Sequence, residues 1–135
     1  MGDLLLSLNV WAVLVAAVLY FLLGALWYSL LFANVWMKLR GLNKEDMEEP
    51  DKLIFLWSFL LQLVATCVLA LFLQAMEVGS ASHGAVAGFG AGAGLVFTLA
   101  GSTGLFSNVK IGLHFIDNGY HVVGLTLAGV VLGAW

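Results

Sequence analysis

Residues 110–135 read KIGLHFIDNGYHVVGLTLAGVVLGAW, a stretch that is apolar enough to cross a lipid bilayer. Four polar side chains recur in it at positions i, i+3, i+4 and i+7: His114, Asp117, Asn118 and His121. A helix would place all four on one face. An ionisable side chain inside a membrane span is costly unless it meets a partner, water or a bound molecule, so it marks a functional site. The pattern predicts a transmembrane helix with a functional polar face.

The composition is that of a membrane protein. Hydrophobic residues make up 62% of the 135 residues, charged residues make up 10%, and the mean hydropathy is +1.04. Crossing the hydrocarbon core takes about 20 apolar residues, and residues 10–32, 53–76, 84–106 and 111–135 are each long enough. These runs are continuously apolar, whereas the strands of a membrane barrel would alternate. We therefore predict an all-α fold, a four-helix transmembrane bundle that forms one membrane domain over residues 1–135.

The basic residues predict how the bundle sits in the membrane. Lys38, Arg40, Lys44 and Lys52 lie between the first and second spans, and Lys110 lies between the third and fourth. The positive-inside rule places both connections, including the loop 38–52, in the cytoplasm and both termini outside it. We thus expect a multi-pass protein of the cell inner membrane, with the lipid bilayer as its main partner. A nucleic-acid partner is not expected, because the net charge is −3 and no basic surface is evident.

Glycines are concentrated in the third span. Gly84, Gly88 and Gly92 follow the small-xxx-small spacing that lets helix backbones approach closely, and Gly129 and Gly133 repeat it in the fourth span. We predict that these glycines pack helices together and that the third span is the central helix. The same ridges would offer a surface for a second copy of the chain, so we expect a homo-oligomer, with a dimer as the simplest case.

Polar residues of all four spans fall at one depth. With a rise of about 1.5 Å per residue from the basic ends of the spans, Asp117 lies about 10 Å deep and His121 about 16 Å deep. Tyr28 and Gln62 both fall at about 15 Å. The supporting positions are Ser58 in the second span and Thr98 and Ser102 in the third. The sequence therefore predicts a buried polar layer that opens toward the cytoplasm.

Asp117 and His121 are the predicted centre of this layer. They are i, i+4 partners, so an ionised Asp117 could hold the imidazole by a hydrogen bond and favour its protonated form. Such a pair could take up and release a proton. Tyr28 and Gln62 would add hydrogen bonds, and Trp27 with Tyr28 would offer aromatic surface to an organic or cationic ligand. The alternative is that the uncharged polar side chains only hold the helices together, with Asp117 and His121 as a structural clasp or with Asp117 reaching toward the membrane surface.

Three classes of function fit these features. The first is a homo-oligomeric transporter or channel in which Asp117 and His121 couple proton movement to a small solute. The second is a structural or accessory subunit of a larger membrane complex. The third is a haem- or metal-binding protein in which His121 is a ligand and Gly124 leaves space.

The third class is the weakest, and we predict neither a cofactor nor a metal site, because one deep histidine leaves a metal short of ligands. The sequence has no Ser-His-Asp, Cys-His or HExxH arrangement, so an enzyme is not favoured either.

Two motifs carry a resemblance to a known family. The sequence GALWYS at 24–29, followed by Phe32, Trp36 and Gly41, resembles the first-span motif of the bacterial membrane-protein family called domain of unknown function 1761. The sequence IDNGYH at 116–121, followed by Gly124 and a closing Gly133, Ala134 and Trp135, is similar to the last-span motif of that family. The chain departs from the pattern at Leu30, where the family usually carries a proline. The resemblance implies a small four-span protein and implies no activity, substrate or catalytic residue.

Overall fold

The structure, a computed structural model, describes residues 2–135, and its regular structure there is entirely helical. The elements in chain order are α1 (Gly2–Leu6), α2 (Val10–Leu26), the π-helix η1 (Trp27–Leu31), α3 (Ala33–Arg40), the 3-10 turn η2 (Lys44–Asp46), α4 (Lys52–Ala75), α5 (Ala81–Phe89), the π-helix η3 (Gly90–Phe97), α6 (Thr98–Phe106) and α7 (Ile111–Ala134). In this part of the chain, four helical stretches are long and apolar enough to cross a membrane: Val10–Leu31, Lys52–Ala75, Ala81–Phe106 and Ile111–Ala134. The predicted all-helical fold with four apolar spans is confirmed.

Side chains in the sequence determine where the spans begin and end. The Asn9 side chain accepts hydrogen bonds from two backbone N–H groups in the first turn of α2, both at 3.1 Å. Asp51 caps α4 by accepting from the backbone N–H of Leu53 at 3.1 Å. α3 ends at Gly41, whose φ of +69° is the left-handed conformation that glycine adopts without strain.

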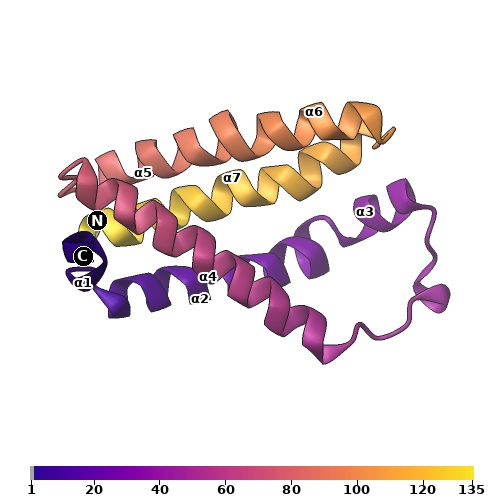
Figure 1. The fold of residues 1–135 in the computed structure, drawn as a ribbon. Helices are drawn as coiled ribbons and strands as arrows, with labels where there is room; N and C mark the ends of the chain where they lie inside the picture. Colours follow the sequence, from indigo (N-terminus) through magenta and orange to yellow (C-terminus); the bar gives the residue numbers. More distant parts are fainter. Residues whose placement is uncertain (1) are drawn as a thin grey trace.

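The first span bends without a proline. The helix widens into the π turn η1, where the backbone N–H of Phe32 donates to the carbonyl of Trp27 at 2.9 Å. Phe32 itself leaves the helical region, with φ −123° and ψ 6°, and α3 continues beyond it (Figure 1). A π turn is a recognised cause of helix kinks, so the segment that contains Leu30 bends although it lacks the proline usual in the family.

α7 is the central helix of the bundle. It contacts α2, α3, α4, α5, η3 and α6, whereas the stretch from α5 to α6 packs mainly along α7 as an outer layer (Figure 1). The prediction that the glycine-rich third span would be central is therefore wrong. The buried core lies where α2, α4 and α7 meet, and it consists of Ala16, Tyr20, Leu69, Leu73, Tyr120, Leu125 and Ala128.

One end of the bundle carries the basic residues, and we call it the basic end. α3, η2, the start of α4 and the start of α7 all lie there, and both termini lie at the opposite end (Figure 1). Lys110 ties two of these segments together, because its Nζ donates to the carbonyl of Leu39 at 2.7 Å. α4 crosses α2 and diverges from α2 and α3 toward the basic end, where residues 41–51 connect α3 to α4 (Figure 1).

Glycines bring the backbones of α5 and α7 into contact. A Cβ atom on Gly84 would lie 2.0 Å from the carbonyl oxygen of Gly129, and one on Gly88 would lie 2.1 Å from that of Leu125. A Cβ on Gly92 would lie 2.6 Å from Cα of Val122, and one on Gly133 would lie 2.4 Å from the carbonyl oxygen of Ser80. The two glycine ridges therefore face each other within the chain, and they do not form the outward surface for a second copy that we expected from the sequence.

We predict that Gly88→Ala destabilises the bundle. The added methyl group would meet the Leu125 backbone, which cannot move without separating α5 from α7, so the free energy of unfolding should fall by about 1–3 kcal/mol. The matched control is Gly94→Ala, because a Cβ there meets nothing within 4 Å. Denaturant unfolding of both variants in detergent micelles measures the difference, and equal effects would contradict the proposed contact.

Candidate functional site

The side chain of Tyr120 connects three spans at the core. It is 4% exposed, and its hydroxyl donates to the backbone carbonyl of Tyr20 in α2 at 3.0 Å. The same hydroxyl accepts a hydrogen bond from Nε2 of Gln62 in α4 at 2.8 Å. The Tyr120 ring also lies 5.4 Å from the Tyr20 ring and 5.6 Å from the Tyr28 ring, centroid to centroid. One buried residue of α7 thus binds both α2 and α4.

The orientation of the Gln62 amide follows from the number of protons available. The carbonyl of Tyr20 can only accept, so the single hydroxyl proton of Tyr120 points at it and the Gln62 group that faces Tyr120 must be the NH2. Nε2 also lies 3.4 Å from the Ser58 hydroxyl. The amide oxygen of Gln62 is buried and has no hydrogen-bond partner among the described residues. An unsatisfied buried acceptor costs about 1–3 kcal/mol, so this oxygen is a place where a bound donor would be favoured.

The Asp117 carboxylate is held from the first span. Its Oδ1 accepts hydrogen bonds from the Tyr28 hydroxyl at 2.9 Å and from the Trp36 indole N–H at 3.0 Å. Arg40 stacks over the Trp36 ring, with its Cζ 4.9 Å from the ring centroid. Two neutral donors on one oxygen stabilise the charge without neutralising it. Trp36, which the sequence analysis named only as part of the first-span motif, reaches Asp117 because α3 follows the bend at η1 and packs on α7.

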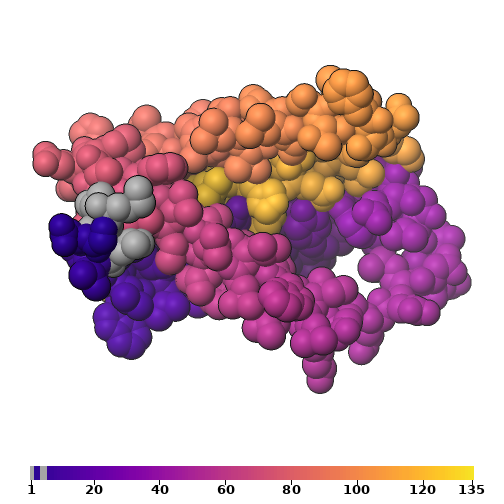
Figure 2. All heavy atoms as spheres, viewed as in Figure 1, coloured from indigo at the N-terminus to yellow at the C-terminus, as the bar shows by residue number. Residues whose placement is uncertain are grey.

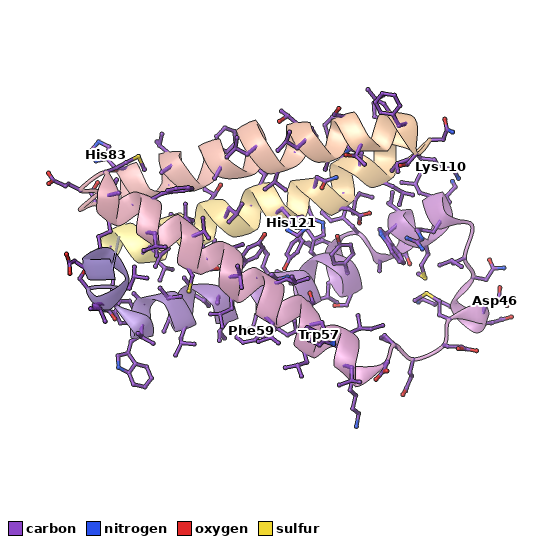
Figure 3. The ribbon with its side chains drawn as sticks, in the orientation of Figure 1. Asp46, Trp57, Phe59, His83, Lys110 and His121 are labelled. Carbon is purple, nitrogen blue, oxygen red and sulfur yellow. The ribbon has the colours of Figure 1, made fainter. Side chains whose placement is uncertain are left out.

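His121 has a different partner. Its Nδ1 lies 2.7 Å from the hydroxyl of Tyr20, whose side chain is 2% exposed. His121 lies near the middle of α7, and its side chain faces α2 (Figure 3). The two members of the expected pair therefore bind separate tyrosines instead of each other. Because α2 runs antiparallel to α7, Tyr20 meets the deeper His121 and Tyr28 meets Asp117 nearer the basic end.

Gly124 leaves space that Tyr20 fills. A Cβ atom on Gly124 would lie 2.0 Å from Cε2 of the Tyr20 ring. This is the space that we expected a haem to use if His121 were its ligand, and a side chain of the protein occupies it. Within residues 2–135, no group of three or more His, Cys, Asp or Glu side chains is placed to hold a metal ion.

The predicted polar face of the fourth span divides into two. Asn118 and His114, both in α7, form a hydrogen-bonded pair in which Nδ2 of Asn118 lies 2.9 Å from Nδ1 of His114. The His114 ring packs on Phe97 with centroids 4.3 Å apart, and the space for it is left by Gly101. Asn118 therefore belongs to a separate contact and does not join Asp117.

Three other predicted residues also lie outside the site. Thr98 and Ser102 are exposed, and the Thr98 hydroxyl donates to the carbonyl of Gly94 in its own helix at 2.7 Å. Trp27 donates its indole N–H to the carbonyl of Ile116 at 3.0 Å, and it faces a different hollow, between η1, η3 and α7. The structure thus brings together Asp117, His121, Tyr28 and Gln62, with Ser58 beside Gln62.

A cavity of about 850 Å³ lies between the first span, α3 and α4. Its volume is within the range of about 300–1,000 Å³ that is usual for sites of small organic ligands. Tyr28, Trp36, Ser58, Gln62 and Tyr120 supply polar groups to a lining that is otherwise mostly apolar. Figure 2 shows an opening between the connection 41–51 and the first turns of α4, at the basic end.

These features define a class of protein: a four-span helical membrane protein with a hydrogen-bonded aromatic centre beside a cavity. The chain belongs to the family described as protein of unknown function (DUF1761), whose model matches residues 11–133. The matched stretch contains every residue of the site described above, and the family predicted from the two motifs is confirmed. Comparisons with curated proteins and with solved structures gave no match.

We predict that Gly124→Ala displaces the Tyr20 ring from His121. The new methyl group would overlap that ring, so the free energy of unfolding should fall by about 1–3 kcal/mol and the ring nitrogens of His121 should change their chemical shifts. Gly119→Ala in the same helix is the control, since its nearest neighbour would be a ring atom of Trp27 at 3.7 Å. Nitrogen-15 NMR of histidine-labelled protein reports the shifts, and an unchanged His121 in Gly124→Ala would refute the contact.

Proposed function

We propose that this protein is a small membrane transporter that binds a solute in the cavity and links its movement to protonation of Asp117. One observation carries the proposal: Tyr28 and Trp36, the two residues that donate to Asp117, also line the cavity. The carboxylate itself lies behind them. A solute in the cavity therefore touches the same side chains that stabilise the charge.

The link between solute and proton follows from this shared use of donors. When a solute displaces the Tyr28 hydroxyl or the Trp36 indole N–H, Asp117 loses a hydrogen bond that stabilises its charged form. An intramembrane carboxylate with fewer partners is costly, so it takes a proton from the aqueous phase at the basic end. When the solute leaves, the donors return and the proton is released. His121, held by Tyr20 one turn deeper in α7, is the second group that can exchange a proton.

The location of the protein is part of the proposal. We propose the cell inner membrane, with the basic end in the cytoplasm and both termini outside, because all the lysines and arginines lie at that end. A homo-oligomer also stays a prediction. Any second copy would have to use a surface other than the ridges at Gly84, Gly88 and Gly129, since these are occupied within the chain.

The two other classes of function have less support. An accessory subunit would need a free packing surface, and the glycine ridges at Gly84, Gly88 and Gly129 are not free, because they face each other inside the bundle. A haem ligand would need open space at His121, and the Tyr20 ring fills the space at Gly124.

We predict that Asp117→Asn abolishes proton-linked uptake. The test uses proteoliposomes with an imposed pH gradient and an internal pH-sensitive dye, to which a panel of small aromatic and aliphatic solutes is added. Wild-type vesicles should show solute-dependent proton movement, and Asp117→Asn should show none because an amide cannot bind the proton. Asp46→Asn, an exposed change in η2, should behave like the wild type. Equal proton movement in the wild type and Asp117→Asn would contradict the proposal.

Cysteine labelling tests the proposed orientation. In a Cys67→Ala background, Asp46→Cys lies at the basic end and Ser82→Cys at the opposite end. A membrane-impermeant maleimide added to intact cells should label Ser82→Cys but should label Asp46→Cys only after the cells are opened. The reverse pattern would show that the protein is oriented with its basic end outside.

A further inference from the structure

The cavity also points to the chemical class of the solute, an inference that rests on the proposed function. We infer that the site takes a neutral, largely apolar organic molecule that carries a hydrogen-bond donor and presents it to Oε1 of Gln62. The inference combines the apolar lining of the cavity, the hydrogen bonds already made at its inner end and the charge within the lining.

Apolar and aromatic side chains form most of the lining. Phe21 and Phe55 come from the first and second spans, and Met37 and Met47 come from α3 and the connection that follows it. Methionine side chains are flexible and polarisable, so they adapt to ligands of irregular shape. A solute that fills this space must bury apolar surface against it.

The inner end of the cavity has one acceptor that nothing in the described chain uses. The Tyr28 hydroxyl donates to Asp117, the Tyr120 hydroxyl donates to the Tyr20 carbonyl, and the Gln62 NH2 donates to the Tyr120 hydroxyl. Among the buried side-chain nitrogen and oxygen atoms of the described residues, Oε1 of Gln62 is the one without a hydrogen-bond partner. It belongs to a side chain that is 8% exposed. The oxygen lies within the wall, with less than 1 Å² exposed, so a solute reaches it only when the Gln62 amide turns toward the cavity. A donor that makes this bond relieves the cost of an unsatisfied buried acceptor.

The charge within the lining of the cavity disfavours a cation. Among the described residues that line it, Lys44 is the only charged one, and it comes from η2 near the mouth. Asp117 does not line the cavity, and its Oδ1 is already bonded to Tyr28 and Trp36. A cationic amine would therefore lose its water without gaining a counter-ion, which is expensive inside a membrane. A neutral O–H or N–H group avoids this cost and still satisfies Gln62.

A lipid acyl chain is the competing occupant, because the lining would accommodate it equally well. It differs from the inferred class in one respect that can be measured, since it has no donor for Gln62. The decisive comparison is thus between two molecules of nearly the same shape, of which only one can donate.

1-Naphthol and 1-methoxynaphthalene form such a pair. Binding of each tritiated compound to the full chain in lipid nanodiscs is measured by equilibrium dialysis, with empty nanodiscs subtracted. We expect the wild type to bind 1-naphthol about tenfold more tightly than the methyl ether, the ratio expected for one hydrogen bond to a buried group. Equal affinities would overturn the inference and favour an acyl chain as the occupant.

Two variants with matched controls locate the site. Gln62→Met should reduce the preference for 1-naphthol to about one, because it removes the acceptor and keeps a side chain of similar length. Gln74→Met, in the same helix but bonded to Ser7 at the other end of the bundle, should keep the preference. Ala25→Phe should narrow the cavity and weaken binding of both compounds, whereas Leu61→Phe, 71% exposed and outside the lining, should not. Binding to Ala25→Phe at wild-type affinity would place the site elsewhere and overturn the inference.

The inference and the proposed function can fail separately. A clear preference for 1-naphthol without solute-dependent proton movement in proteoliposomes would support the ligand class and overturn the transport proposal. Absence of binding by either compound, together with Asp117-dependent uptake of some other solute, would overturn the ligand class and leave the transport proposal standing.

Discussion

The arrangement of the spans depends on the two hydrogen bonds of the Tyr120 hydroxyl. It donates to the Tyr20 carbonyl and accepts from Gln62, so a single group on α7 sets the positions of α2 and α4. Tyrosine can do this in a membrane because its ring buries apolar area while its hydroxyl both donates and accepts. The glycines serve the same arrangement, since Gly24 leaves room for this hydroxyl and Gly124 leaves room for the Tyr20 ring. Without these contacts, Asp117 and His121 would lack their tyrosine partners.

The sequence predicted the fold well and the site in part. Continuous apolar runs fix the length and number of spans whatever their neighbours are, so the four spans were found close to their observed bounds. Glycine spacing predicts that a helix packs closely but does not say against which helix. The third span was therefore predicted to be the central helix, although α7 is the central one. The rise per residue placed Gln62 at the depth of polar residues in the fourth span. It does not tell which way a side chain points from its helix. Thr98 and Ser102 have a suitable depth and face outward.

The partners of Asp117 and His121 were missed for a related reason. Residues one turn apart on a helix are natural partners only when no neighbouring helix offers a better one. Here the first span brings a tyrosine to each of them, Tyr20 from α2 and Tyr28 from η1, and the bend at η1 brings Trp36 to Asp117 as well. The π turn contains no proline, so no residue in the sequence indicates the new direction of α3. The separate contact of Asn118 with His114 likewise required knowing that Phe97 and Gly101 lie beside them.

The central claim is that the cavity and the Asp117 carboxylate form one unit through Tyr28 and Trp36. Infrared difference spectroscopy on protein carrying carbon-13 in its aspartate carboxyl groups tests this directly, by comparing nanodiscs with and without 1-naphthol at constant pH. The account predicts that ligand binding produces the C=O stretching band of a protonated aspartic acid, absent in Asp117→Asn and weakened in Tyr28→Phe. Ligand binding that leaves the carboxylate bands of the wild type unchanged would contradict it.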